Sequence, residues 1–304
     1  MTEKTRQLLP SLSLLSAMLL WASSFVATKL AFAAYHPMQV MFARMLLASL
    51  CFVAFIPAFR KIKVRKSDLK YLMLMCLCEP CLYFLLEAQA LKLTSASQAG
   101  MITAMLPLMV AILAWKWLKE DISPRTVFGF FVAILGACWL TLAGGATTNA
   151  PNPLLGNLCE FLAMVCAAFY MILIKRLTYS LPPLFLTAFQ SFVGSLFFFP
   201  FLLHPAVGWD VSWERIPGLA VIYLGTAVTF GAYACYNYGA SRVPANRAAG
   251  YVNLIPVFCV ILGMVILGDR LNLAQWLACG VVFCGVWLSS ATRTTVESAL
   301  PTSS

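Results

Sequence analysis

Long apolar segments separated by short polar joints account for most of this chain. Several of these segments exceed the roughly 18 apolar residues at which a helix can cross the hydrocarbon layer of a membrane. Proline and glycine mark most of the joints, as at Pro37, Pro124 and Pro205. The pattern predicts ten membrane-spanning helices, at residues 8–33, 38–58, 69–91, 96–118, 126–143, 154–177, 182–203, 216–242, 248–267 and 274–290.

The composition agrees with this pattern and argues against a water-soluble domain. Of the 304 residues, 62% are apolar and 11% are charged. Soluble domains have about 45–50% apolar and about 25% charged residues. Because the joints are short, we expect an all-α integral membrane protein with a single membrane domain, followed by a disordered polar tail at residues 292–304.

Lys and Arg are distributed unequally between the two sides that ten helices would create. With the N-terminus inside, sixteen of them fall in inner segments and three in outer segments. This bias predicts that both termini are cytoplasmic. The net charge of +10 therefore reads as a topology signal rather than a nucleic-acid site. Its densest run, at residues 60–70, would lie on the cytoplasmic face near anionic lipid.

The chain also repeats itself at a constant offset of 149 residues. Ala96-Ser-Gln-Ala99, Pro107, Glu120, Val132 and Gly136 recur as Ala245-Asn-Arg-Ala248, Pro256, Asp269, Val281 and Gly285. An offset near half the length predicts two five-helix repeats, at about 8–143 and 154–290. Because five is odd, the second repeat must cross the membrane in the opposite direction. Inverted repeats are typical of secondary transporters, whose solute site lies near the midplane between the halves.

Ionisable residues inside the predicted spans are the first candidates for function, because each costs about 2.5–3.5 kcal/mol at the centre of a membrane helix. They are Lys29, Arg44, Glu79, Glu87 and Glu160. All except Glu79 fall in one layer toward the predicted outer side. There, two cations and two carboxylates could neutralise each other and fix the packing of the helices. Lys29 could instead extend its ammonium group outward to the membrane surface.

Glu79 differs because it lies near the middle of its predicted span. Glu79, Tyr83 and Glu87 are spaced four residues apart, which places them in one polar stripe along a helix. Pro80 removes a backbone donor and should bend the helix beside Glu79. The Glu79 carboxyl could load a proton or bind a solute amine. Alternatively, it could stay protonated and hydrogen-bond to a neighbouring helix.

The eighth predicted span is unusually polar. At about 100° per residue, one of its faces collects Thr226, Thr229, Tyr233, Tyr236 and Asn237. Gln98, Gln190 and Asn253 add further amides in other spans. An aromatic and amide-lined cavity suits an amphipathic organic solute better than a bare ion. The alternative is that these groups bond between helices. Pro107 and Pro256 occupy matching places in mid-helix, where they could permit gating or form static kinks.

Several motifs together resemble the drug/metabolite transporter superfamily. They are Trp21-Ala-Ser-Ser-Phe-Val-Ala-Thr-Lys29, Pro37 with Arg44, Ala90-Leu91 with Thr94-Ser-Ala96, Pro107, and Trp115 before Lys119-Glu120. The chain is most similar to the EamA-type ten-helix exporters, whose turn after helix 9 reads Gly268-Asp269-Arg270-Leu271 here. The resemblance implies two inverted halves, a bacterial inner membrane, export of amino acids or similar metabolites, and Trp21 in the pocket wall.

We therefore expect a secondary transporter that exports a small organic metabolite by alternating access, with Glu79 or Glu87 available for proton coupling. The alternative is a channel-like or small-multidrug-type efflux protein for organic cations. We do not expect an enzyme, because the sequence has no P-loop and only two histidines, His36 and His204. No cofactor and no nucleic-acid partner is predicted. The expected partners are the solute and membrane lipid, with the chain acting as a monomer or a homodimer.

Overall fold

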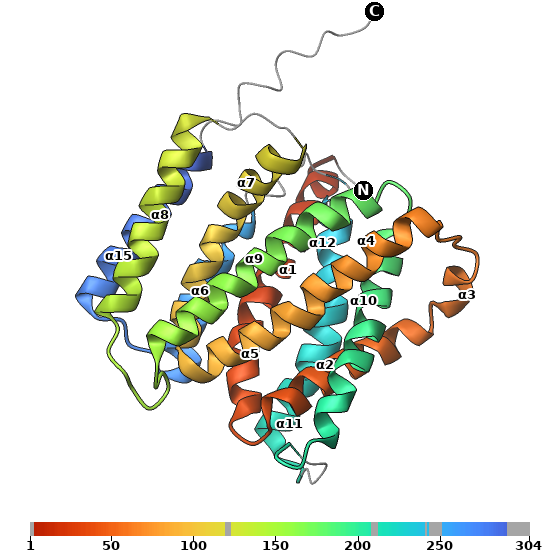
Figure 1. The fold of residues 1–304 in the computed structure, drawn as a ribbon, viewed down its shortest axis with the longest axis horizontal. Coiled ribbons are helices and arrows are strands. Elements are labelled where there is room, and N and C mark those ends of the chain that lie inside the picture. Colours follow the sequence, from red (N-terminus) through yellow and green to blue (C-terminus); the bar gives the residue numbers. More distant parts are fainter. Residues whose placement is uncertain (1–2, 119–122, 208–211, 241, 243–250, 291–304) are drawn as a thin grey trace, which may run out of the picture.

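A computed structural model describes residues 3–118, 123–207, 212–240, 242 and 251–290 of the chain. Within these residues the chain is a bundle of helices (Figure 1). Seven of the described helices are long and apolar enough to cross a membrane, and three further apolar helices are shorter. The prediction of an all-α membrane protein is confirmed.

The first half of the chain contains α1 (Glu3–Phe32), α2 (Pro37–Val53), α3 (Ile56–Phe59), α4 (Lys66–Cys76), the segment η1 (Leu77–Leu82), α5 (Tyr83–Leu93), α6 (Ala96–Ile102), the 3-10 turn η2 (Thr103–Met105), α7 (Leu106–Leu118) and α8 (Pro124–Ala143). The second half contains α9 (Pro153–Leu177), α10 (Pro183–Phe198), the 3-10 turn η3 (Phe199–Leu203), α11 (Arg215–Tyr223), the π-helix η4 (Leu224–Ala232), α12 (Tyr233–Ala240), α14 (Ile255–Leu262), the π-helix η5 (Gly263–Leu267) and α15 (Leu273–Ser290). The prediction of one long helix at residues 38–58 is wrong. Helix α2 ends at Val53 because Pro57 lacks the N–H that would continue it.

Prolines coincide with breaks inside three of the predicted spans. Pro107 and Pro256 are each the second residue of a new helix, α7 and α14, so they begin helices where the sequence predicted kinks within them. A proline costs nothing in the first turn, where its missing N–H has no partner in any case. The bend predicted beside Pro80 is present. Glu79 has extended backbone angles, φ −145° and ψ 119°, which interrupt the helix between α4 and α5.

The most extensive helix–helix contact among the described residues joins equivalent elements of the two halves. Helices α8 and α15 pack side by side along one edge (Figure 1). A methyl group on Gly136 would meet the backbone nitrogen of Val282, and one on Gly285 would meet the backbone nitrogen of Ala133. The offset of 149 also relates Ala133 to Val282. The two contacts are therefore equivalent, because the offset of 149 residues converts one into the other. The sequence repeat is thus also present in the packing of α8 against α15.

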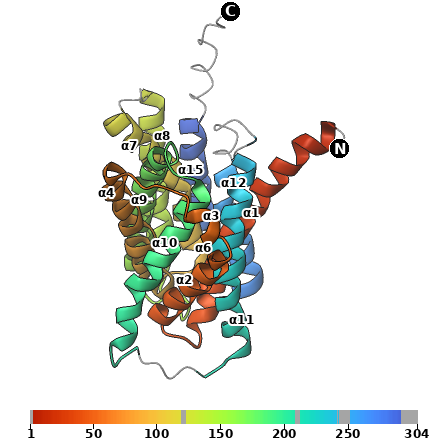
Figure 2. The same ribbon diagram turned by 90° about the vertical axis from the view of Figure 1, so that its right-hand side faces the viewer.

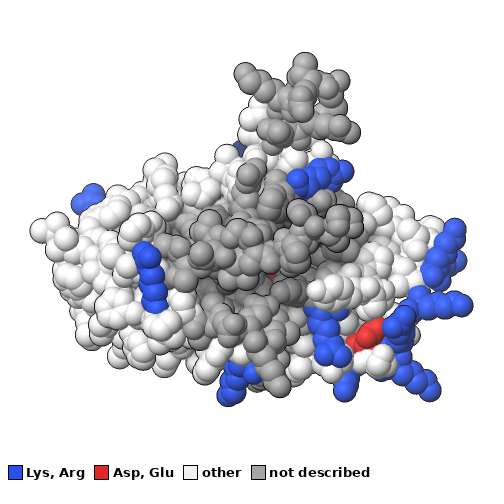
Figure 3. Space-filling view, turned by 90° about the horizontal axis from the view of Figure 1, so that it is seen from above, with Lys and Arg blue, Asp and Glu red and all other residues white. Residues whose placement is uncertain are grey.

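The beginning of α1 and the end of α15 lie at the same end of the bundle, with the first turns of α1 extending away from it (Figure 2). Seen from that end, Lys and Arg side chains gather at the rim, most densely on the side of α3 and α4 (Figure 3). The basic run of residues 60–70 joins these helices. We refer to this surface as the basic face.

Candidate functional site

Buried and half-buried polar side chains from both halves of the chain meet inside the bundle. We call this group the central polar cluster, and its members are Arg44, Glu79, Tyr83, Glu87, Glu160, Tyr170, Gln190, Thr229 and Tyr233. Helix α2, the segment η1 and helix α5 supply the first four, and α9, α10, η4 and α12 supply the others. The cluster therefore lies at the boundary between the two repeats.

Arg44 and Glu87 form the charged part of the cluster. The Arg44 Nη1 lies 3.7 Å from Glu87 Oε2, and its Nε donates to Thr229 Oγ1 at 3.0 Å. The guanidinium carbon also lies 4.3 Å from the centre of the Phe84 ring. Arg44 and Glu87 are 5% and 2% exposed, and neither Arg44 Nη1 nor Glu87 Oε2 has a hydrogen-bond partner. The pair is thus shielded from solvent yet retains one donor and one acceptor that a solute could use.

Glu79 lies beside a group of aromatic side chains. Tyr233 donates its hydroxyl to Glu79 Oε1 at 2.8 Å. The Tyr233 ring makes an edge contact with Trp21 at 5.4 Å between ring centres, and the Tyr236 ring lies 5.2 Å from Trp21. Glu79 belongs to η1, and Tyr233 directly follows η4. The segment η1 is a kink between two helices, whereas η4 is a π-helix, a form that is rare and frequently occurs at functional sites.

Only part of the predicted stripe along the third span is bonded together. Tyr83 donates to Glu87 Oε1 at 2.9 Å, as expected for neighbours one turn apart on α5. Glu79 precedes the helix interruption and bonds to Tyr233 instead. The interruption therefore directs Glu79 toward α12, while Tyr83 and Glu87 stay with Arg44.

Glu160 on α9 has the least compensated charge in the cluster. It is 0% exposed, and neither of its carboxylate oxygens has a hydrogen-bond partner. Glu87 is the charged neighbour that acts on it. The expectation that Lys29 and Glu160 belong to one self-neutralising layer is wrong, because Lys29 Nζ donates to the carbonyl oxygen of Asn149 at 2.5 Å.

Gln98 also bonds elsewhere. Asn157 Nδ2 donates to Gln98 Oε1 at 3.0 Å and to Thr141 Oγ1 at 2.9 Å, and Thr94 Oγ1 donates to Asn157 Oδ1 at 2.7 Å. This buried network joins α5, α6, α8 and α9. The Oε1 of Gln98 is thus bonded within the protein, as expected of a residue that holds helices together.

The polar face predicted for the eighth span is only partly formed. Thr229 and Tyr233 join the cluster, whereas Thr226 donates back to the carbonyl of Ile222 in its own helix. The prediction of a shared face assumed 100° per residue, and the π-helix η4 turns less per residue. The side chain of Asn237 lies outside the described residues. Asn253, on the turn before α14, has a buried Oδ1 without a partner.

Two members of the site were not selected from the sequence. Tyr170 donates to Gln190 Oε1 at 3.1 Å and also interacts with Tyr233. Phe84 covers the Arg44 guanidinium. A tyrosine within a predicted membrane span, on the same span as Glu160, was the available signal for Tyr170. No sequence pattern distinguishes Phe84 from the many other phenylalanines.

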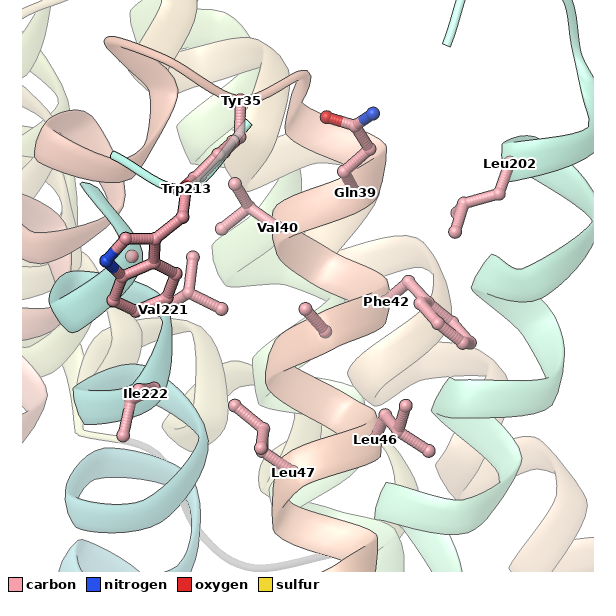
Figure 4. Close-up of a pocket in the computed structure, with 12 residues that line it drawn as sticks. Tyr35, Gln39, Val40, Phe42, Leu46, Leu47, Leu202, Trp213, Val221 and Ile222 are labelled. Atoms are coloured by element: carbon pink, nitrogen blue, oxygen red, sulfur yellow. The ribbon is translucent and has the colours of Figure 1, made fainter. Parts of the chain in front are cut away.

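A separate groove opens on the surface of the bundle between α2 and α11 (Figure 4). Its volume is about 370 Å³, and apolar side chains such as Val40, Leu47, Val221 and Ile222 form most of its wall, with Trp213 at one end. A wall of this kind suits hydrocarbon better than a polar solute. The central polar cluster is therefore the better candidate for solute binding.

Comparison with known proteins identifies the group to which this architecture belongs. The EamA-like transporter family matches residues 8–142 and, a second time, residues 154–291. A relative named uncharacterized transporter YetK, from Bacillus subtilis, is 26% identical over 226 residues, which cover 74% of this chain and 68% of YetK. An uncharacterized transporter from Archaeoglobus fulgidus is 25% identical over 275 residues, which cover 90% and 94% of the two chains.

The fold also occurs among solved structures. One crystal structure superposes with a TM-score of 0.64 over 92% of this chain and 98% of the other, at 22% sequence identity. The family and the named relatives are transporters, which confirms the expectation of a transporter and not an enzyme. With two family matches that together span nearly the whole sequence, the chain is a member of the EamA-like transporter family within the drug/metabolite transporter superfamily.

Proposed function

We propose that this protein is a secondary transporter that exports a small organic metabolite, an amino acid or a related compound, by alternating access. One observation carries the proposal. The two hydrogen bonds Arg44–Thr229 and Glu79–Tyr233 each join one repeat to the other inside the bundle. A solute that binds between these residues would sense, and could stabilise, either arrangement of the two halves.

Groups of the cluster without hydrogen bonds support a solute that carries both charges. Arg44 Nη1 has no hydrogen bond and could bind a carboxylate, and Glu87 Oε2 and the Glu160 oxygens, which also have none, could bind an ammonium group. Buried polar atoms rarely lack partners, so an outside group that satisfies them would gain affinity. Trp21, Tyr233 and Tyr236 would offer aromatic surface to the solute side chain.

Proton exchange at Glu79 or Glu87 would couple export to the proton gradient. Each carboxyl already accepts one tyrosine hydroxyl and has a second oxygen available. Loading a proton and binding a cationic group are mutually exclusive uses of such a carboxyl. Solute and proton would therefore cross the membrane in opposite directions.

The proposed setting is the bacterial inner membrane, with both termini cytoplasmic and the repeats divided at about residues 143 and 154. The basic face supports this orientation, because Lys and Arg are favoured on the cytoplasmic side. The active unit would be a monomer or a homodimer, with membrane lipid around it. No cofactor enters the proposal.

One observation favours a second candidate, the efflux of organic cations. Trp21, Tyr233 and Glu79 place two aromatic rings and a carboxyl side by side. Aromatic rings attract cations through their faces, at about 0.5–2 kcal/mol per contact. A solute with a positive charge and no carboxylate could bind there without using Arg44.

The test is exchange flux in liposomes that contain the purified protein. Liposomes loaded with one amino acid should take up the same labelled amino acid in a saturable manner, and protein-free liposomes should not. A panel of amino acids and of quaternary ammonium compounds then separates the two candidates. Saturable exchange of quaternary ammonium compounds, with none for any amino acid, would reject amino acid export in favour of cation efflux.

A further inference from the structure

Asp269 joins the two halves from the short joint between η5 and α15, and the first turn of α15 lies at the end of the bundle opposite the basic face (Figure 1). Its Oδ2 accepts two hydrogen bonds from Ser97, at 3.0 Å from the backbone nitrogen and 2.8 Å from the hydroxyl. Ser97 is 0% exposed and Asp269 is 8% exposed. We call these two residues the latch. It spans the repeats, because one residue lies in each of the two segments that match the family.

The helices behind the latch are in very close contact. A methyl group at Gly100 on α6 would collide with Cys259 of α14. A methyl group at Gly263 on η5 would collide with the side chain of Ser97 on α6. Cys259 is 0% exposed, and its Sγ lies 3.5 Å from the carbonyl oxygen of Ala22 on α1. With the latch formed, α1, α6 and α14 are thus closely packed at this level.

A nearby cation stabilises the latch by electrostatic attraction. Lys29 on α1 is close enough for its charge to attract Asp269, and its Nζ donates to the Asn149 carbonyl in the loop between α8 and α9. The carboxylate of Asp269 also faces an N–H in the first turn of α6, where the helix dipole favours a negative charge. The attraction to Lys29 and the favourable position at the start of α6 both depend on the charge of Asp269.

The sequence repeat places an acidic residue at the position of Asp269 in both halves of the chain. Asp269 occupies the position in the second repeat that Glu120 occupies in the first, so an acid follows the matching helix in both halves. The contact itself consists of two charge-assisted hydrogen bonds over a small area. Such a contact is strong enough to bias an equilibrium and small enough to break and reform.

We propose that the latch is the gate that closes the solute pathway at the end opposite the basic face. Opening toward that side requires Asp269 to release Ser97, so that α6 and α14 separate. The inference rests on alternating access in the proposed function. Under the proposed topology this end faces the periplasm, and the state described here is closed on that side.

Cys259 is a native reporter for this movement. It lies one helical turn inward from Gly263, is fully buried, and packs against Gly100 of α6 and Ala22 of α1. In right-side-out membrane vesicles, a membrane-impermeant cationic thiol reagent should modify Cys259 slowly in the unaltered protein. Asp269→Asn should raise the rate about tenfold and Ser97→Ala about threefold, because the first removes the charge and the second removes one hydrogen bond. Mass spectrometry of the Cys259 peptide separates this thiol from the other ten cysteines.

Ser95→Ala is the matched control. Ser95 is as buried as Asp269 and accepts the N–H of Gln98 in the first turn of α6, but this bond stays within one repeat. Labelling of Cys259 should not change in this variant. Equal acceleration by Ser95→Ala and Asp269→Asn would mean that any loss of α6 stability exposes Cys259, and would overturn the gate. Unchanged labelling in Asp269→Asn would overturn it as well.

A cross-link tests the opposite change, because it should hold the latch closed. A side chain at residue 263 would meet the Ser97 side chain, so Ser97→Cys with Gly263→Cys should form a disulfide under mild oxidation. The oxidised protein should lose exchange flux and regain it with a reductant, whereas the two single variants should not respond. Full flux in the cross-linked protein would overturn the gate. Labelling requires no transported solute, so accelerated labelling without flux of any solute would sustain the gate and reject the proposed function.

Discussion

The hydroxyl of Tyr233 donates to Glu79 Oε1 across 2.8 Å, and the two residues belong to different repeats. Arg44 and Thr229 are related in the same way, at 3.0 Å. In both pairs the second-half residue lies in or beside the π-helix η4, where the backbone departs from regular winding. The polar centre is therefore built by the two halves together, and its geometry depends on how they are docked.

Glu79→Gln should remove the response of export to a proton gradient. The amide keeps the shape of the side chain and can still accept the Tyr233 hydroxyl, but it cannot load a proton. In liposomes with an imposed pH difference, the unaltered protein should transport solute faster when protons flow in the opposite direction. The transport rate of the variant should be the same with and without the pH difference. Tyr233→Phe is the control, because it removes the hydrogen bond and retains the acid. A Glu79→Gln protein that still follows the gradient would remove Glu79 from coupling.

Arg44→Met should destabilise the protein much more than the double variant Arg44→Met/Glu87→Met. The single change leaves Glu87 buried without its cation, and breaking a buried ion pair costs about 3–5 kcal/mol. Removal of both charges leaves apolar side chains of similar size and should recover most of this loss. Thermal unfolding of the detergent-solubilised proteins measures the difference. A double variant as unstable as the single one would show that Arg44 acts mainly through Thr229 and Phe84.

The sequence was sufficient for the features that depend on composition and local chain stiffness. Long apolar segments and the repeated residues predicted an all-helical membrane protein with two repeats, and Pro80 predicted the bend beside Glu79. These effects are local, so they can be read along the chain. The early end of α2 was missed because the apolar pattern continues through Pro57, although its backbone hydrogen bond does not.

The partners of the site residues could not be predicted in the same way. Lys29 and Glu160 fall at similar depth along their spans, yet Lys29 bonds to Asn149 and Glu160 has no hydrogen-bond partner. Depth gives the height of a side chain and not the direction in which it points. That direction depends on helix rotation, and the π-helix η4 changes the rotation where Thr226 and Thr229 diverge.

Gly285→Ala should weaken the contact between α8 and α15, whereas Gly280→Ala on the same helix should not. A methyl group at residue 285 would overlap the backbone of Ala133 and Gly129, which cannot move without separating the helices. Overpacking of this kind costs about 1–3 kcal/mol. Residue 280 has open space around its Cα, so alanine there should be neutral or slightly stabilising through helix propensity. Equal melting temperatures for the two variants would contradict the close α8–α15 contact.

Glu160→Met should stabilise the protein and at the same time reduce transport. Both oxygens of Glu160 are buried without hydrogen bonds, and each such group costs about 1–3 kcal/mol relative to an apolar replacement of similar volume. Functional sites commonly lose stability in exchange for activity, so we expect that Glu160 is kept because transport requires it. Glu160→Gln is the control, since it keeps the volume and the polarity and should not raise the melting temperature. Thermal unfolding and exchange flux are measured on the same preparations. A Glu160→Met protein with a lower melting temperature would mean that the carboxyl is bonded in the working protein, with Glu87 as the nearest acid to share a proton with it.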